Sequence, residues 1–548
     1  MRSAHVPPAS LPTTDTLRRT RAEVPEEVDV AIVGAGLGGL TAAAYLARQG
    51  HTVAVFDSHY VAGGCATGFA RGTAASRYVF DVGVHYVGDA GPGGAFEQLL
   101  APLDAHVEFA PLDPDGFDTL VFPDFRFRIP VGRDLFRDRL VELFPEERRG
   151  IDRYVGYLAQ LEGFVDALDA QDGAMSPRVG LHLMRRAPAV AASMALRWNM
   201  SSLLDRCTRD PRLRAVLLGQ SGDYGLPPSE VSPLLHCALA NHYFRGAWYP
   251  KGGGQVIADR IADSAEQAGA SVHLQTLVDR IVVEDGRATG VQITPRGQEP
   301  RTVRARAVIS NADAKRTMLE LVGPEHLPKR WIRRATDWTV ADGIFMTCLG
   351  VKGDLALDGM GRTNYWIFDH YDTERLYTSV RSDPDAMPQG AYITSASMKD
   401  PGGHNAPEGV STVEVMTVLP GDLAHWGLTQ GAFDDGSYRG QAVYQDRKQR
   451  LEDQMVGRLE TMFPGTAERI VFQESATPIS HMRYTRASSG SGYGLAATPS
   501  QFALGRPRAR LGPQGLYIAG ASARSGHGIL SAIRSGRTTA LELAKDLA

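Results

Sequence analysis

The chain has 548 residues, which is too many for one ordinary hydrophobic core, so we expect at least two closely joined domains. Its 43% hydrophobic and 22% charged residues are typical of globular proteins, and the formal net charge of −4 gives no reason to expect a nucleic-acid partner. The four cysteines are scattered, and no His/Cys cluster in the sequence indicates a metal site. This usage fits a reducing compartment.

The N-terminal residues 1–26 are rich in Pro, Thr and Arg without a repeating pattern, and we expect a flexible segment there. Arg18 and Arg19 are not followed by an apolar run, which argues against a secretory or twin-arginine signal. No segment has the length and hydrophobicity of a transmembrane helix. We therefore expect a cytoplasmic protein, with peripheral contact at a membrane left open.

Residues 28–57 are predicted to form a β-α-β unit that binds a dinucleotide. The spacing Gly34-x-Gly36-x-x-Gly39 lies between a strand and a helix, and Asp57 ends the next strand 18 residues later. Gly34 permits the tight turn, and Gly36 lets the backbone approach a pyrophosphate at the N-terminus of the helix. Gly39 allows close packing of helix on strand, and Asp57 is placed to accept hydrogen bonds from the ribose hydroxyls.

The later elements follow the same alternation around a helix-rich middle. Residues 135–245 are predicted to be mainly helical, and 252–269 forms a further helix. Alternating apolar residues predict a hairpin over 272–294 with its turn at Asp285-Gly286. A strand, a glycine-rich turn and a helix close the chain at 515–548. Similar units at both ends predict a nucleotide domain assembled from discontinuous segments, with a second domain inserted.

Four stretches resemble the FAD-binding segments of flavin amine oxidases and carotenoid desaturases. They are GAGLGGLTAAAYLARQGHTVAVFDSHYVAGGCATGF at 34–69, WYPKGGGQVIADRIADSAEQAGASVHLQTLVDRIVVEDGRATGV at 248–291, ARAVISNADA at 305–314 and GLYIAGASARSGHGILSAIRSGRTTA at 515–540. The resemblance implies an α/β fold class, with a discontinuous Rossmann-like FAD-binding domain of the GR2 type and an inserted α+β substrate domain. It also implies that Gly63-Gly64 approaches the flavin phosphates and that the backbone near Val278 meets the adenine.

This resemblance gives a domain division and a set of cofactor residues. The FAD-binding domain would comprise 27–105, 246–335 and 480–548. The substrate domain would comprise 106–245 and 336–479, with a helical lid or a membrane-facing part. The residues implied to hold FAD are Gly34, Gly36, Gly38, Gly39, Asp57, Ser58, Gly63, Gly64, Cys65, Asp81, Val278, Gly520, Gly528 and Ile529.

The stretch FDVGVHYVG, residues 80–88, is predicted to be a strand that places Asp81, His85 and Tyr86 among apolar residues. It resembles retinol saturases, whose corresponding strand also carries Gly-x-His-Tyr. The resemblance implies that this strand runs under the flavin and that Asp81 turns toward the cofactor or the Gly63-Gly64 loop. His85 and Tyr86 would then lie between the flavin and the substrate cavity. The alternative is that both are hydrogen-bonded core residues.

After Gly520 the chain has Ala521-Ser522, as in the phytoene desaturase, carotenoid isomerase and retinol saturase branch. That resemblance implies an FAD-dependent oxidoreductase acting on carbon–carbon double bonds of a long hydrophobic polyene or isoprenoid. Reduction is the preferred prediction, and desaturation and flavin-assisted cis–trans isomerisation are the alternatives. The predicted catalytic residues are His85, Tyr86 and His527, although His527 could equally be a solvent-facing turn residue.

The electron donor is open at this stage. No second strand–GxGxxG–helix unit is present in the sequence, so NADPH would bind at the flavin face or the electrons would come from another donor. Two other functions share the fold. A flavin amine oxidase would need an aromatic cage, and Cys65 is not at that family's C-terminal flavin-linking position. A non-enzymatic escort protein is the other function with this fold, and the intact C-terminal FAD motif argues against it.

Residues 180–204 mix Arg185, Arg186 and Arg197 with Met, Leu, Ala and Trp. This pattern suits an amphipathic helix that contacts a membrane at the mouth of a lipophilic tunnel, and the substrate would be delivered by a membrane or by a carrier. It equally suits a core-facing helix with a basic outer side.

Overall fold

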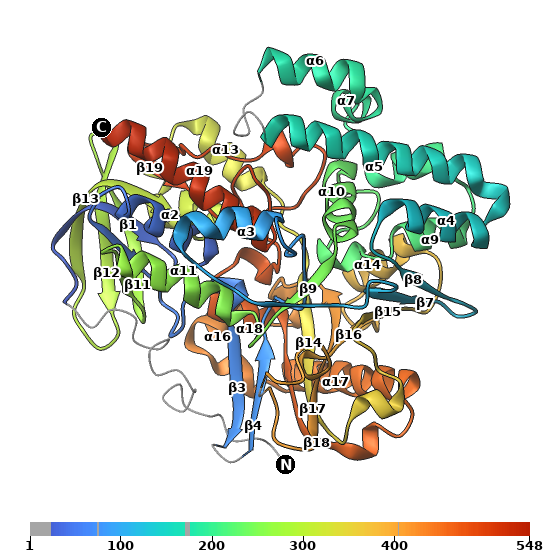
Figure 1. Ribbon diagram of the computed structural model, residues 1–548. Helices are drawn as coiled ribbons and strands as arrows, with labels where there is room; N and C mark the ends of the chain where they lie inside the picture. The colour runs from blue at the N-terminus through green and yellow to red at the C-terminus, as the bar shows by residue number, and fades with distance from the viewer. Residues whose placement is uncertain (1–22, 74–75, 170–175, 404) are drawn as a thin grey trace.

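The computed structural model describes residues 23–73, 76–169, 176–403 and 405–548. Residues 1–22 of the predicted flexible segment 1–26 lie outside the described residues. Two seven-stranded sheets and a group of helices organise the described chain (Figure 1). The first sheet lies at the left of that view, the second at the lower right and the helices at the upper right.

The first sheet is Rossmann-like and collects strands from both ends and the middle of the chain. Its parallel strands are β10 (Ser271–His273), β2 (Val53–Phe56), β1 (Glu27–Val33), β13 (Arg301–Ser310) and β19 (Leu516–Ile518). An antiparallel hairpin, β11 (Thr276–Glu284) and β12 (Arg287–Pro295), pairs with the first half of β13. The central strands are buried apolar runs, as a parallel sheet covered on both faces requires. The predicted α/β class with discontinuous assembly is confirmed.

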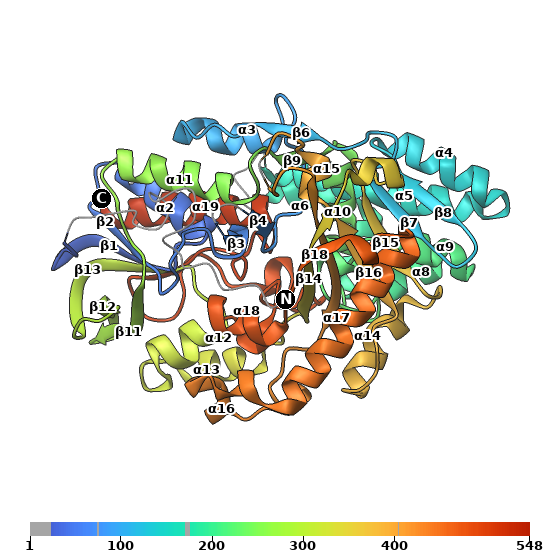
Figure 2. The same ribbon diagram turned by 90° about the horizontal axis from the view of Figure 1, so that it is seen from below.

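Helices α2 (Leu37–Ala47), α11 (Gln255–Gln267) and α19 (Ile529–Leu547) lie side by side along this sheet (Figures 1 and 2), with α3 (Ala95–Leu100) beside α19. Helix α19 approaches α2 very closely. A Cβ atom added at Gly536 would lie 2.2 Å from the carbonyl oxygen of Gly38, so the contact needs glycine at residue 536.

The second sheet is mainly antiparallel, with one parallel pairing between β15 and β7. Its strands, in spatial order, are β18 (Ile470–Ala476), β14 (Gly343–Lys352), β17 (Val410–Leu419), β16 (Gly390–Thr394), β15 (Asn364–Phe368), β7 (Asp118–Val121) and β8 (Arg126–Ile129). Helix α17 (Ala442–Met462) runs along this sheet in Figure 2. Two small sheets complete the strands: β3 (Gly68–Thr73) with β4 (Ser76–Asp81), and β5 (Val87–Gly88) with β9 (Ala247–Pro250) and β6 (Phe109–Pro111).

Most of the other helices come from the predicted helix-rich middle, which is confirmed. They are α4 (Arg133–Leu143), α5 (Arg148–Asp169), α6 (Pro177–Arg186), α7 (Pro188–Ala195), α8 (Met200–Cys207), α9 (Pro211–Leu217) and α10 (Pro233–Phe244). Later in the chain come α12 (Ala314–Arg316), α13 (Lys329–Asp337), α14 (Thr373–Ser382), α15 (Ala396–Lys399), α16 (Gln430–Asp435) and α18 (Pro478–Thr485). The strands of each large sheet fall inside the ranges predicted for one domain, and the domain boundaries stay a prediction.

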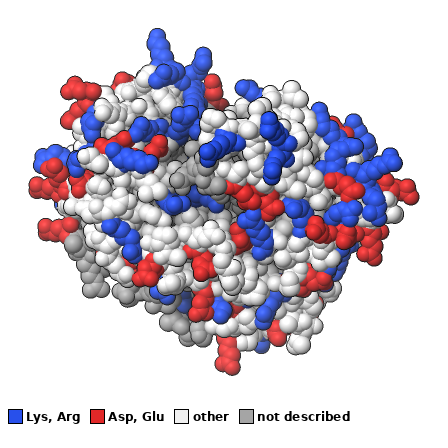
Figure 3. Space-filling view, turned by 45° about the horizontal axis from the view of Figure 1, so that its top comes forward, with Lys and Arg blue, Asp and Glu red and all other residues white. Residues whose placement is uncertain are grey.

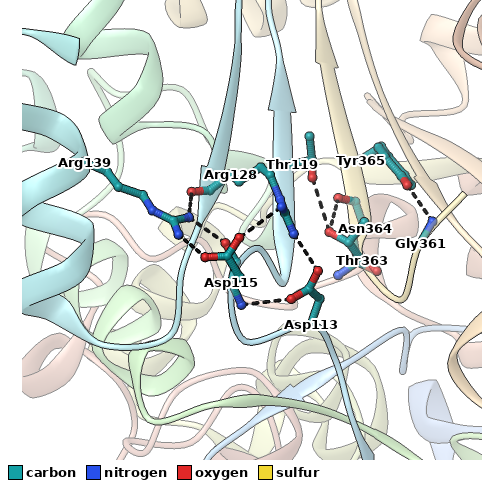
Figure 4. Close-up of polar contacts among 9 residues, drawn as sticks. All are labelled: Asp113, Asp115, Thr119, Arg128, Arg139, Gly361, Thr363, Asn364 and Tyr365. Atoms are coloured by element: carbon teal, nitrogen blue, oxygen red, sulfur yellow. Dashed lines mark hydrogen bonds and ion pairs between the residues drawn. The ribbon is translucent and has the colours of Figure 1, made fainter. Parts of the chain in front are cut away.

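The hairpin of β7 and β8 is anchored at its open end by ion pairs (Figure 4). Arg128 on β8 lies 2.5 Å from the Asp113 carboxylate and 3.0 Å from that of Asp115. Arg139 on α4 also contacts Asp115. These contacts hold the start of β7, where the fully buried Asp118 begins the strand.

The prediction of one strand over residues 80–88 is wrong. Strand β4 ends at Asp81, residues 82–86 bend, and β5 begins at Val87. A Cβ atom at Gly83 would lie 3.0 Å from the carbonyl oxygen of Cys65, so the bend passes close against the 63–66 loop. Residues on both sides of the bend are buried, so the sequence keeps an alternating apolar pattern through it. An alternating apolar pattern does not reveal a bend between buried residues, which is why the sequence predicted one strand.

Replacing Gly536 by alanine should lower the free energy of unfolding by about 1–3 kcal/mol, because the new methyl group would overpack the contact with Gly38. Urea unfolding of the purified protein measures this change. The matched control is Gly457→Ala in α17, where a Cβ meets nothing within 4 Å and alanine should be neutral or stabilise by up to about 1 kcal/mol. Equal stability of the two variants would contradict the close approach of α19 to α2.

Candidate functional site

A cavity of about 2410 Å³ opens between the two sheets and the helices of the middle segment. Its lining includes the glycine turn after β1, strands β14, β15 and β17 of the second sheet, and helices α5 and α10. The volume exceeds the roughly 300–1,000 Å³ of a typical small-ligand pocket. The cavity therefore has room for a dinucleotide together with a second, long ligand.

Most of the predicted cofactor residues line this cavity. They are Gly34, Gly36, Gly38, Asp57, Ser58, Gly63, Gly64, Cys65, Val278, Gly520, Gly528 and Ile529. Two predicted residues are not part of the lining, Gly39 and Asp81. A Cβ atom at Gly39 would lie 2.3 Å from the Gly34 carbonyl oxygen, so Gly39 serves the packing of α2 on β1.

The glycine turn forms a cradle closed by Asn311 at the end of β13. A Cβ atom at Gly36 would lie 2.6 Å from Asn311 Nδ2, and one at Gly38 would lie 2.6 Å from both Asn311 Oδ1 and the amide nitrogen of Gly520. Asn311 Nδ2 donates a hydrogen bond of 3.3 Å to the Gly34 carbonyl. Three distant segments thus meet at distances that admit no side chain on the turn, which leaves backbone amides as the lining for a ligand.

Two helix N-termini face the cavity. Gly36 precedes the first turn of α2, and Gly528 precedes that of α19; among the described residues, no side chain caps either helix. Neither first turn carries an acidic residue. Unsatisfied N–H groups and the positive ends of the helix dipoles therefore favour an anionic or electron-rich ligand such as a pyrophosphate.

Asp57 is held at the end of β2 by backbone amides. Its Oδ2 accepts a hydrogen bond of 2.7 Å from the Ala35 amide, and its Oδ1 accepts one of 2.8 Å from His59. Each carboxylate oxygen keeps a second lone pair, so Asp57 can still accept hydrogen bonds from ligand hydroxyls. Val278 of β11 lines the cavity close by, because the Thr276 amide donates to the Asp57 carbonyl at 2.8 Å.

The second glycine pair lies directly against the first turn. The Gly63 amide donates a 2.7 Å hydrogen bond to the Ala35 carbonyl, and Gly63 pairs with Gly36 in a parallel bridge. Both Gly63 (φ +131°) and Gly64 (φ +61°) adopt positive φ, which favours glycine. Cys65 is exposed and lines the cavity, and desolvation by the surrounding cavity walls raises the pKa of its thiol to about 11, so the thiol stays neutral.

The expectation that Asp81 turns toward the cofactor or the Gly63-Gly64 loop is wrong. Its Oδ1 accepts a hydrogen bond of 2.8 Å from the Gly254 amide, and its Oδ2 accepts one of 2.6 Å from the Tyr249 hydroxyl. The chain bends directly after Asp81, and this directs the carboxyl group toward the segment that leads into α11. Burial and the nearby Glu414 raise the pKa of Asp81 to about 6.

His85 lies at the boundary between the cavity and a buried ionic cluster. Its Nδ1 is 3.4 Å from Glu414 Oε2 without hydrogen-bond alignment. Its backbone carbonyl accepts a hydrogen bond of 2.6 Å from the Lys399 ammonium. Burial lowers the pKa of Lys399 to about 8, and the Glu414 carboxylate opposes that shift. His85 therefore connects the cavity wall to charged groups beneath it.

Tyr86 lines the cavity with its ring stacked on Tyr243 at a centroid distance of 4.3 Å. Its hydroxyl lies 2.8 Å from Asp223 Oδ2 and 3.1 Å from Asp118 Oδ2. The phenol therefore links two carboxyl groups. Burial raises the pKa of Tyr86, with Asp118 adding to the shift, so the hydroxyl keeps its proton.

His527 is buried in the cavity wall, so its alternative interpretation as a solvent-facing turn residue is wrong. Its ring lies 5.3 Å from that of Tyr493, and neither ring nitrogen has an aligned hydrogen-bond partner among the described residues. Burial and Arg506 lower its pKa to about 3, while the Asp223 backbone opposes that shift. The imidazole is therefore neutral near pH 7, and both of its nitrogens are buried in the cavity wall.

Several residues of the site were not predicted from the sequence: Asn311, Asp118, Asp223, Lys399 and Glu414. Asn311 lies inside a stretch that was recognised as a cofactor segment, so its polar side chain next to a strand end was a usable signal. The other four are single charged residues spread over almost 300 positions. No spacing connects them, because the sheets alone bring them together.

Two family models match parts of the chain. An NAD(P)-binding Rossmann-like domain matches residues 32–103, and an FAD-binding domain matches residues 173–337. Relatives match over most of the length. The chain is 29% identical to the all-trans-retinol 13,14-reductase of Danio rerio over 86% of this chain and 78% of that protein. It is 25% identical to prolycopene isomerase 1 of an Oncidium hybrid cultivar over 96% of this chain and 85% of that protein.

Solved structures agree on the fold. Putrescine oxidase bound to putrescine aligns with a TM-score of 0.59 at 16% sequence identity, covering 95% of this chain and 99% of that one. An oxidoreductase from Methanosarcina mazei aligns with a TM-score of 0.58 at 17% identity, covering 94% of this chain and all of that one. Such identities support the fold alone.

The cradle of glycines, the two helix N-termini and the buried neutral imidazole fit an FAD molecule in this cavity, in agreement with the matched domains. The chain is thus similar over most of its length to retinol reductases and carotenoid isomerases, and these relatives together with the matched FAD-binding domain support an FAD-dependent oxidoreductase that acts on carbon–carbon double bonds.

Proposed function

We propose that this FAD-dependent oxidoreductase reduces a carbon–carbon double bond of a long hydrophobic polyene. The observation that carries the proposal is that a single cavity is lined both by the predicted dinucleotide residues and by a group of apolar side chains from α5 and α10, which we call the apolar branch. That branch is lined by Leu161, Phe164, Val165, Leu168, Leu234, Leu235, Ala238 and Leu239. Reduction is supported by the similarity to all-trans-retinol 13,14-reductases.

The cofactor would be held by the chain's backbone more than by its side chains. We assign the pyrophosphate to the turn at Gly36 and the N-terminus of α2, and the adenosine ribose to Asp57. The N-terminus of α19, at Gly528 and Ile529, would face the flavin ring. Bound FAD supplies hydride transfer in this class of enzyme. The protein's task is then to hold an apolar substrate dry beside it and to provide a proton.

Isomerisation is the second candidate, because the prolycopene isomerases match nearly the whole chain. Desaturation would use the same cavity with the opposite direction of hydride transfer. His85, Tyr86 and His527 remain proposed to supply or to position the proton in these reactions. NADPH is proposed as the electron donor for the two reactions that need reduced flavin.

A membrane is the proposed source of the substrate. Helix α6 packs on α5, which lines the apolar branch, and it exposes Leu181 and Met184 beside Arg185 and Arg186. Apolar side chains flanked by arginines suit the interface of an anionic bilayer. Over the face seen in Figure 3, basic side chains alternate with acidic and uncharged surface. Insertion of the apolar side chains Leu181 and Met184 would therefore supply much of the affinity for the membrane. Among the described residues, no helix has the length and apolar character needed to cross a bilayer.

Anaerobic mixing tests the reaction class. The flavin of the purified protein should bleach with NADPH, and all-trans-retinol or a longer polyene should then restore its colour and gain two hydrogen atoms. Flavin reduced by dithionite serves as the control that bypasses the donor. A product of unchanged mass and altered geometry would favour isomerisation. Bleaching of oxidised flavin by the polyene itself would favour desaturation.

Removal of the Asp57 carboxylate tests the cofactor assignment. Asp57→Ala should weaken FAD binding about 10- to 100-fold, because charge-assisted hydrogen bonds contribute about 1.5–3 kcal/mol. Titration of the apoprotein with FAD, followed by flavin fluorescence, measures the dissociation constant. Asp285→Ala at the exposed hairpin tip is the matched control and should bind FAD as the wild type does. Unchanged affinity in Asp57→Ala would refute the ribose assignment.

Vesicle co-sedimentation tests membrane delivery. The wild type should bind vesicles of phosphatidylcholine and phosphatidylserine, and Leu181→Ser/Met184→Ser should bind about tenfold less, because two apolar side chains no longer enter the interface. Leu357→Ser, which alters a still more exposed leucine elsewhere, should leave binding unchanged. If the wild type did not sediment with these vesicles, the membrane proposal would be removed.

A further inference from the structure

Two buried carboxyl groups, Asp118 and Asp223, share the hydroxyl of Tyr86 across 3.1 and 2.8 Å. They come from segments more than 100 residues apart, the start of β7 and the 3₁₀ turn Ser221–Asp223. Two carboxylates this close in a buried site cannot both ionise without a large electrostatic cost. Their surroundings decide which of the two keeps the proton.

Asp118 has the surroundings of the ionised member. Its Oδ1 accepts a hydrogen bond of 2.8 Å from Asn364, and its Oδ2 accepts one of 2.8 Å from Gln220 in addition to the Tyr86 contact. Asn364 is itself fixed by the Thr394 hydroxyl, which donates to its Oδ1 at 2.9 Å. Three donors stabilise a negative charge on Asp118, although burial still raises its pKa to about 6.

Asp223 has the surroundings of the protonated member. Among the described residues, its carboxyl group has one hydrogen-bond partner, the Tyr86 hydroxyl. Burial and the charge on Asp118 raise its pKa to about 8. Near pH 7 the pair therefore carries one negative charge, on Asp118, and one proton, on Asp223.

The position of Asp223 gives that proton a use. Ser221, Gly222 and Asp223 line the cavity, and the Tyr493 hydroxyl donates 2.7 Å to the Gly222 carbonyl. Tyr493 in turn contacts His527 of the loop that precedes α19, and the Asp223 backbone also lies against His527, so Asp223 lies next to the proposed flavin end of the cavity. The other titratable groups around Asp223 are Tyr224, Tyr243, Tyr377, Tyr392, Tyr493 and His527; burial keeps all of them neutral near pH 7.

We propose that Asp223 is the proton donor of the double-bond reduction. This inference rests on the proposed function, with the flavin reduced by a nicotinamide. One alkene carbon receives the hydride from the reduced flavin, and the neighbouring carbon receives the proton as the Asp223 O–H bond breaks. The alkene gains two hydrogens, the flavin is left oxidised, and the Asp223 carboxylate regains a proton from water before the next turnover. Tyr86 is a positioning residue, because its hydroxyl fixes the distance between the two carboxyl groups.

The test separates the two half-reactions. Asp223→Asn should leave flavin bleaching by NADPH unchanged and slow reoxidation by the polyene about 100-fold or more, because the amide supplies no acidic proton. Asp223→Glu should restore part of that rate. In the wild type, the reoxidation rate should fall as pH rises through about 8, because the donor must be protonated. Asp166→Asn is the control at the exposed rim and should keep wild-type rates.

A second readout does not depend on turnover. Infrared spectroscopy at pH 7 should show the carbonyl band of a protonated carboxyl group in the wild type, absent in Asp223→Asn and lost above about pH 8. A wild type without this band would overturn the proposal, as would an Asp223→Asn variant that is folded, FAD-loaded and reoxidised at the wild-type rate. If no polyene reoxidises the wild-type flavin, the proposed function fails instead, and the donor role for Asp223 fails with it.

Discussion

The close contact of three backbone segments around Asn311 is the constraint on which the rest of the site depends. The turn after β1, the end of β13 and the loop after β19 approach so closely that a Cβ atom at Gly36, Gly38 or Gly520 would lie 2.4–2.6 Å from the Asn311 amide. This contact brings the N-termini of α2 and α19 to the same cavity, although about 490 residues separate them. Two dipole ends and a set of backbone amides then face the same cavity.

The second sheet supplies a different kind of wall. Its strands contribute apolar and aromatic side chains to the cavity, and two of its carboxyl groups, those of Asp118 and Glu414, are buried. Burial shifts the pKa values of Asp81, Asp118 and Asp223 upward to different extents, because each accepts a different set of hydrogen bonds. In the proposed reaction, such buried carboxyl groups would let a site that excludes water from a polyene still hold a proton.

The relation between the two walls explains why the cavity is large. The lining includes the turn residues from Asp57 to Gly528 as well as the apolar side chains of α5 and α10, and His85, Tyr86 and His527 belong to the same lining. In the proposed function the first group would hold the dinucleotide and the second the long apolar chain. Burial and the nearby Arg506 lower the pKa of His527, so its imidazole is neutral. His527 therefore adds no positive charge to the cavity wall.

The sequence by itself determined the parts of the protein that depend on local backbone geometry. The spacing from Gly34 to Asp57 predicted a dinucleotide-binding β-α-β unit, because glycines at fixed offsets have a local physical reason, and similar units at both ends of the chain predicted its discontinuous assembly. The resemblance of the second glycine pair and of the C-terminal motif to FAD-binding segments added the other proposed cofactor residues, most of which line the cavity. Only the tertiary structure decided where Asp81 points, that the chain bends at residues 82–86, and that Asp118 and Asp223 share one hydroxyl. These features arise from contacts between residues far apart in the chain, and the burial that sets their protonation exists only when the two sheets are assembled.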